Sequence, residues 1–339
     1  MNFRIGLFLK RLVYVALAGL VIFLIARSWR NAHNAEEPVS DDAAGTAVFD
    51  ELTLTEIAYS NADTTLTFIR DAEDGLFYWS TSRDFPLDRT RLEKTERDLA
   101  ALSPVLVTEE ADEELLETYG LDNPTYAMQA TYSDGTVLSF TLGNATDEGN
   151  YYMRYADEER TAEVYTVGSG IALDMAYGIY DMYLLETLPS FTEETLVSVA
   201  VNRGDVGKLY RMRQSGSGDS THYTWFLGGN SAEDQPGVAD LTETLSRLAF
   251  SSCAVWKPTK KTLSVCGLTK PAASVEIVYK DTTERERTFA FRIGNAYDDA
   301  YFIYAEGMDA VYTMSGEMLK PFLQIAGFAV EKNDTDKQG

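Results

Sequence analysis

The chain has 339 residues, of which 29 are Lys or Arg, 53 are Asp or Glu, two are His and two are Cys. This length predicts about two folded domains at roughly 150 residues each, and a hydrophobic content of 45% excludes a mostly disordered polymer. The net charge of −24 argues against binding to nucleic acid, because phosphate contacts need a basic face. The few Cys and His residues match no zinc spacing, and we expect no cofactor.

An uninterrupted apolar segment, residues 12–26, lies near the N-terminus between basic residues. With snorkelling basic ends, about 20 residues can span a bilayer. A cleaved signal peptide is the alternative, but the residues after the segment, 26–30, carry two Arg and one Trp. We therefore predict an uncleaved, single-pass membrane anchor over residues 1–30.

The charges around this segment predict its orientation. Three basic residues precede it and two follow it, which favours an N-terminus inside and a C-terminal part outside. Residues 31–49 are small, polar and acidic, and predict a flexible acidic tether. We expect a protein of the cell membrane whose folded part is extracytoplasmic.

The rest of the chain contains an internal duplication. Trp79 matches Trp225 at an offset of 146 residues, and Gly120 to Pro124 match Gly267 to Pro271 at an offset of 147. We therefore predict tandem repeats. They are repeat 1 (residues 50–190) and repeat 2 (residues 191–328), followed by a disordered tail (residues 329–339).

Each repeat shows the same pattern of elements. Strands come first, then an amphipathic helix at about 87–102 or 238–250, then a meander of strands with alternating apolar residues, and finally a short helix. Short turns between alternating strands favour antiparallel pairing with one solvated face. The expected fold class is α+β: an N-terminal transmembrane helix followed by two tandem repeats, each a mainly antiparallel sheet with one longer amphipathic helix and short helices.

Two Gly-Asn-Ala segments, each followed by acidic residues, are candidate partner-contact loops. Exposed carboxylates could bind a partner or calcium, but neither loop has the spacing of a calcium-binding loop. The alternative is a turn at the end of a strand, with its acids facing water. The candidate residues are Asn144, Asp147, Glu148, Asn295, Asp298 and Asp299.

Tyrosines on two predicted strands form a candidate aromatic platform for a glycan or a peptide. Aromatic residues on strands also fill cross-strand pairs and cores, which is the alternative. The candidate residues are Tyr152, Tyr155, Tyr301 and Tyr304.

The sequence contains no recognisable catalytic constellation. A Ser-His-Asp triad would need His222, and no Gly-x-Ser-x-Gly segment supplies a nucleophile. We predict no catalytic, cofactor-binding or metal-ligating residues, and a protein that is not an enzyme. Cys253 and Cys266 lie 13 residues apart, and the sequence leaves open whether they form a disulfide.

The motifs resemble domain-of-unknown-function family 4340. The resemblance rests on Tyr119 to Pro124, its partner Cys266 to Pro271, and the strand and hairpin run that ends at Val167, and it covers about residues 51–322. Cys266 stands where the first copy has Tyr119. The resemblance implies a bacterial, membrane-anchored, extracytoplasmic protein, often encoded beside gliding-motility-type ABC transporter components, with no accepted catalytic residues.

The expected function is that of a membrane-anchored extracytoplasmic accessory or binding protein associated with an ABC-type transport system. Its expected partners are the membrane, through residues 12–26, and envelope proteins such as ABC transporter subunits. A cell-envelope glycan- or peptide-binding module is the alternative, and an unrecognised hydrolase that uses paired acids is the second alternative.

Overall fold

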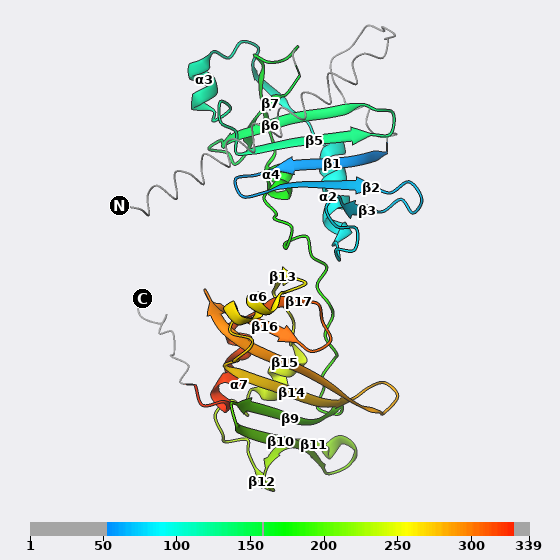
Figure 1. Cartoon of the computed structure of the whole chain (residues 1–339), viewed down its shortest axis with the longest axis vertical. Coiled ribbons are helices and arrows are strands. Elements are labelled where there is room, and N and C mark those ends of the chain that lie inside the picture. Colours follow the sequence, from blue (N-terminus) through cyan, green and yellow to red (C-terminus); the bar gives the residue numbers. More distant parts are fainter. Residues whose placement is uncertain (1–52, 158, 329–339) are drawn as a thin grey trace, which may run out of the picture. The chain divides into compact units, whose positions relative to one another are not determined.

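Two antiparallel β-sheets dominate the structure (Figure 1), a computed structural model that describes residues 53–157 and 159–328. The first sheet has eight strands in the order β3-β2-β1-β5-β6-β7-β8-β4. The second has nine, in the order β12-β11-β10-β9-β14-β15-β16-β17-β13. Apart from β12, the two sheets therefore have the same order of strands.

The first sheet and its helices come from the first half of the described chain. The strands are β1 (Leu54–Ser60), β2 (Thr65–Arg70), β3 (Phe77–Trp79), β4 (Val105–Thr108), β5 (Tyr126–Tyr132), β6 (Val137–Ala145), β7 (Tyr151–Tyr155) and β8 (Val164–Val167). The helices are α2 (Arg89–Ala100), α3 (Glu113–Thr118) and α4 (Ser169–Met175).

The second sheet follows a linker, which we define as residues 176–195. Its strands are β9 (Leu196–Arg203), β10 (Val206–Ser215), β11 (His222–Leu227), β12 (Asn230–Ser231), β13 (Ser252–Trp256), β14 (Ala273–Lys280), β15 (Glu286–Tyr297), β16 (Ala300–Ala305) and β17 (Ala310–Ser315). The helices are α5 (Leu241–Ser246), α6 (Lys260–Val265), α7 (Gly316–Ile325) and the 3₁₀ helix η1 (Gly218–Ser220).

Apolar periodicity explains which faces are buried. On β5, Met128, Ala130 and Tyr132 are buried and alternate with half-buried residues, as expected for a strand with one face on a core. On α2, the buried residues are Leu92, Thr95 and Leu99, which form one stripe of the helix. The predicted amphipathic helix of repeat 1 is therefore present, and it contacts α4 on the core side of the first sheet.

The α+β fold class is wrong. The described residues form mainly two antiparallel sheets, with few and short helices. The segments between the predicted amphipathic helix and the predicted meander each contribute an edge strand, β4 and β13. The predicted helix over residues 238–250 is helical only over α5, because residues 238–240 form turns after Gly237, whose φ of +83° is left-handed.

The described residues contain no helix that is long and apolar enough to cross a membrane. The predicted transmembrane helix within residues 1–30, the tether (residues 31–49) and the tail (residues 329–339) lie outside the described residues.

Candidate functional site

The two Gly-Asn segments, at Gly143-Asn144 and Gly294-Asn295, form hydrogen bonds with the ends of α3 and α6. The Asn144 side-chain amide donates a hydrogen bond to the Thr118 carbonyl at the end of α3 (3.0 Å), and its backbone N–H donates to the Tyr119 carbonyl (2.8 Å). In the second sheet, Asn295 makes the same two bonds to Val265 (3.0 Å) and Cys266 (2.8 Å) at the end of α6. Because the last carbonyls of a helix lack partners within the helix, each Asn satisfies two of them from the neighbouring strand.

The glycines before these asparagines allow the close approach. A Cβ atom on Gly143 would lie 2.2 Å from the Tyr119 carbonyl oxygen, and one on Gly294 would lie 2.1 Å from that of Cys266. No side chain fits at such distances, so that only glycine is compatible with this contact between strand and helix end.

The acidic residues of the two loops point to solvent. Asp147 and Glu148 are exposed in the turn between β6 and β7, and Asp298 and Asp299 are exposed between β15 and β16. The two turns belong to different sheets. Within residues 53–157 and 159–328, no group of three His, Cys, Asp or Glu residues could hold a metal ion.

The four candidate tyrosines are divided between faces and sheets. Tyr152 stacks on Tyr119 with ring centroids 4.1 Å apart, whereas Tyr155, three residues later, packs against the main core. On β16, Tyr301 packs against the main core, and Tyr304 packs against a separate small cluster around Cys266. The structure therefore does not bring these four side chains together as one platform.

The edge strands β4 and β13 occupy equivalent places but differ in exposure. Leu106 on β4 pairs with Tyr165 on β8, as Cys253 on β13 pairs with Tyr312 on β17, and each pair is followed by a bulge. Leu106 is 46% exposed, whereas Cys253 is 4% exposed. The neighbours of Leu106 on β4, Val105 (64%) and Val107 (43%), are also exposed. Three consecutive apolar side chains of β4 therefore face solvent.

Side chains from other parts of the chain cover the second edge. Tyr183 of the linker contacts Tyr312 with ring centroids 6.2 Å apart, and Phe250 stacks on the same ring at 3.9 Å. Near the end of β13, the ring of Phe85 packs edge-on against Trp256 at 5.3 Å.

This cover includes a buried polar group. The Tyr183 hydroxyl donates to Glu186 Oε1 (2.9 Å) beside the covered strand. Burial raises the pKa of the Cys253 thiol to about 12, and the negative charge of Glu186 adds to this rise. Burial also raises the pKa of the Tyr312 hydroxyl well above its ordinary range. Cys253 and Cys266 are both buried free thiols, without a disulfide between them.

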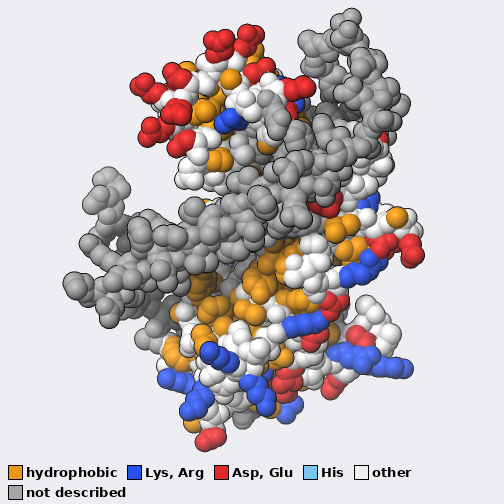
Figure 2. All heavy atoms as spheres, turned by 45° about the horizontal axis from the view of Figure 1, so that its top comes forward, with side chains coloured by type: hydrophobic (Ala, Val, Ile, Leu, Met, Phe, Trp, Pro, Cys, Tyr) orange, Lys and Arg blue, Asp and Glu red, His pale blue; other side chains and the backbone are white. Residues whose placement is uncertain are grey.

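The charge beside the two edges is inverted. In repeat 1, β4 runs into an exposed acidic segment with Glu109, Glu110, Asp112, Glu113 and Glu114. Figure 2 shows acidic side chains gathered in the region of α3, with apolar side chains between them. In repeat 2, the equivalent helix α6 starts with two exposed lysines, Lys260 and Lys261.

A comparison with protein families identifies part of the chain. Residues 79–220 match the model of a domain of unknown function, DUF4340. Over these residues the chain is similar to that family. No curated protein and no solved structure shows significant similarity to the chain.

The DUF4340 segment contains the exposed edge strand. It begins at Trp79, includes β4 to β8 and the linker, and ends at Ser220 within the second sheet. The match therefore includes both β4 and the linker residues that cover β13.

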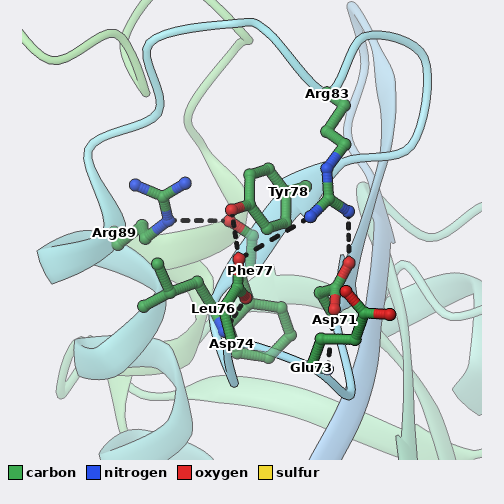
Figure 3. A network of polar contacts seen from close by, with 8 residues as sticks. All are labelled: Asp71, Glu73, Asp74, Leu76, Phe77, Tyr78, Arg83 and Arg89. Carbon is green, nitrogen blue, oxygen red and sulfur yellow. Dashed lines mark hydrogen bonds and ion pairs between the residues drawn. The ribbon is translucent and has the colours of Figure 1, made fainter.

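The described residues also line two clefts, and each cleft contains one of the two tryptophans that match in the duplication, Trp79 and Trp225. A cleft of about 210 Å³ beside β2 and β3 of the first sheet includes Asp71, Tyr78, Trp79 and Arg83. Figure 3 shows how three of these side chains, those of Asp71, Tyr78 and Arg83, lie together. Arg83 forms an ion pair with Asp71 and lies over the Tyr78 ring at 3.9 Å. The Tyr78 hydroxyl donates to Asp74 Oδ2 (2.6 Å), and this bond is the main reason why the pKa of Asp74 lies below its ordinary value.

The larger cleft, of about 620 Å³, lies beside β11 and α5 in the second sheet. Its lining includes Trp225, Tyr223 and three carboxylates, those of Glu193, Glu233 and Glu243. Trp225 donates its indole N–H to Thr242 (2.9 Å) and is buried, so that it serves mainly to pack α5 onto β11.

The strands β4 and β13 were not expected from the sequence. A signal was present, because Val105-Leu106-Val107-Thr108 is a run of apolar and β-branched residues, which strands favour. The offset of 147 residues, which relates Tyr165 to Tyr312, also aligns their partners Leu106 and Cys253.

Proposed function

We propose that this protein is a noncatalytic accessory protein of the cell envelope, associated with an ABC-type transport system, that binds another protein through the open edge of its first sheet. We define the open edge as Val105–Thr108. The observation that carries the proposal is a difference between equivalent edge strands of the described chain: the side chains of β13 are buried or half-buried, whereas Val105, Leu106 and Val107 of β4 are exposed.

An uncovered edge with apolar side chains needs an explanation. Natural proteins protect sheet edges with charges, prolines or covering segments, because free backbone groups invite pairing with another chain. Here three consecutive apolar residues of β4, Val105, Leu106 and Val107, are exposed. Contiguous apolar surface of this kind is typical of an interaction site.

The proposed location is the outer side of the cell membrane. Its support is the sequence alone: the apolar segment 12–26 and the excess of basic residues before it. In this location the acidic folded part would meet membrane and envelope proteins, of which ABC transporter subunits are the proposed partners.

Cross-linking in native membranes tests this function. The tagged full chain is cross-linked mildly, purified and analysed by mass spectrometry, with a tagged chain of residues 1–49 as the control for the membrane-attached segment. We expect an ABC permease or ATPase to be enriched with the full chain only. Equal recovery with both chains, or no transport subunit at all, would reject the accessory role.

The glycan-binding alternative rests on fewer observations. Of the candidate tyrosines, Tyr152 stacks on Tyr119 away from the main core, but Tyr155 and Tyr301 pack against it. The hydrolase alternative would have to use the cleft with Glu193, Glu233 and Glu243, since paired carboxylates in a cleft are what such chemistry requires.

A further inference from the structure

Among the described residues, the strand β4 ends the first sheet and is paired on one side only. It pairs with β8 on one side, and the order of the sheet ends there. The pairing continues beyond the strand, because the Ala111 N–H donates to the Ala162 carbonyl (2.8 Å). Apart from the Glu110 N–H, which donates to Thr108 Oγ1 (3.2 Å), the free side of residues 105–111 therefore offers backbone donors and acceptors to an additional strand.

The side chains at this edge predict the chemistry of that strand. The apolar residues Val105, Leu106 and Val107 suit a segment with apolar side chains, at least on alternate positions. The acidic residues that follow, from Glu109 to Glu114, suit Lys or Arg at one end of it.

The acids have little basic compensation within the chain. No Lys or Arg occurs between Arg97 and Arg154. Of the nearby basic side chains, that of Arg160 is paired with Asp157 and lies over the Tyr155 ring at 3.6 Å. The equivalent position in repeat 2 has lysines at the start of α6, so the acidic edge is a property of repeat 1 alone.

We propose that β4 accepts an extended segment of a partner protein as a ninth strand of the first sheet, a segment with alternating apolar side chains and Lys or Arg residues placed against Glu109–Glu114. This inference rests on the proposed function and names the partner's chemistry. A second copy of the chain is a poorer occupant, because two β4 strands side by side would bring no basic residue to either acidic segment, and the chain carries a net charge of −24.

A defined peptide tests the proposal. The probe is a fluorescein-labelled peptide, Lys-Lys-Thr-Val-Thr-Val-Thr-Val, and its control carries Glu-Glu in place of Lys-Lys. Binding to the purified full chain in detergent is measured by fluorescence anisotropy at low and high salt. We expect the basic peptide to bind at least tenfold more tightly than the acidic one and to lose affinity at high salt, because exposed charges are screened.

Matched variants locate the binding. Leu106→Thr keeps β propensity but removes apolar surface, and we expect it to weaken binding roughly fivefold. The double change Glu109→Gln and Glu110→Gln should weaken it by roughly the same factor. The controls, Val206→Thr on β10 and Glu286→Gln on β15, change exposed residues elsewhere and should bind as the parent chain does.

Hydrogen exchange distinguishes strand addition from charge attraction alone. Amides of residues 105–111 should exchange more slowly when the basic peptide is bound, because free edge groups gain partners. Binding without this protection would overturn the proposal, and so would a chain that dimerises through β4 in sedimentation. If the membrane experiment recovers a transport subunit whose cross-linking survives Leu106→Thr, the accessory role stands, but binding through the open edge fails and this inference fails with it.

Discussion

Gly143→Ala is expected to lower the free energy of unfolding of the first sheet by about 3 kcal/mol. The new Cβ atom would lie 2.2 Å from the Tyr119 carbonyl oxygen and 2.8 Å from the Gly120 carbonyl carbon. Both are backbone atoms, which cannot move aside as the end of a side chain can. The contact must open, and the two bonds from Asn144 to the end of α3 must be lost with it.

Hydrogen exchange with mass spectrometry measures this effect in the full chain. At roughly tenfold per 1.4 kcal/mol, amides of β5 and β6 that exchange through opening of the sheet should exchange about a hundredfold faster. Gly168→Ala is the matched control, because its Cβ atom would have no neighbour within 4 Å and its φ of −60° suits Ala. Similar exchange in the two variants would contradict the role given to Gly143.

Lys94→Met is expected to destabilise the chain by about 2 kcal/mol at neutral pH. Lys94 Nζ lies 2.6 Å from Asp174 Oδ1 and 2.7 Å from Asp98 Oδ2. The Asp174 side chain is only 3% exposed, and its second oxygen has no hydrogen-bond partner in the structure. Removal of Lys94 therefore leaves a buried carboxylate without its cation. The expected cost is below that of a fully buried pair, because Lys94 itself is 47% exposed and solvent screens it.

The loss should depend on pH. Burial raises the pKa of Asp174 above its ordinary value of 3.8, and Lys94 opposes that rise. Without Lys94 the pKa of Asp174 rises further, so that the folded state binds its proton more tightly than the unfolded state does. Stability of the variant then falls as pH rises from about 4 through the new pKa.

Thermal unfolding at about pH 4.5 and about pH 7.5 tests whether the stability of Lys94→Met falls as pH rises. The difference in Tm between Lys94→Met and the parent chain should be larger at the higher pH. Lys208→Met, at an exposed lysine of β10 that forms no ion pair among the described residues, should show little change at either pH. An equal loss at both pH values would mean that Asp174 is not the group that Lys94 stabilises.

Local patterns in the sequence predicted the elements whose side chains alternate or follow a helical stripe. An amphipathic helix was expected at about residues 87–102, and α2 lies there with Leu92, Thr95 and Leu99 as its buried stripe. The order of the meander strands was also readable, because short turns join consecutive antiparallel strands.

Tertiary contacts decided the features that the sequence did not predict. Asn144 and Asn295 resemble ordinary turn residues, and their bonds to α3 and α6 depend on how each helix end meets the sheet. Likewise, Leu106 and Cys253 occupy the same place in two copies, but Leu106 is exposed and Cys253 is buried, and aromatic side chains from distant parts of the chain, such as Tyr183 of the linker, pack beside the second strand. Two tyrosines of β16, Tyr301 and Tyr304, lie on opposite faces because strand side chains alternate.

The open edge of the first sheet is the central claim, and site-specific photo-cross-linking in intact cells tests it most directly. The photoreactive residue p-benzoylphenylalanine replaces Leu106 in one chain and Val206, which is 74% exposed on β10, in another. We expect a discrete adduct with one envelope protein from position 106 and none from position 206. No adduct from position 106, or the same adducts from both positions, would contradict it.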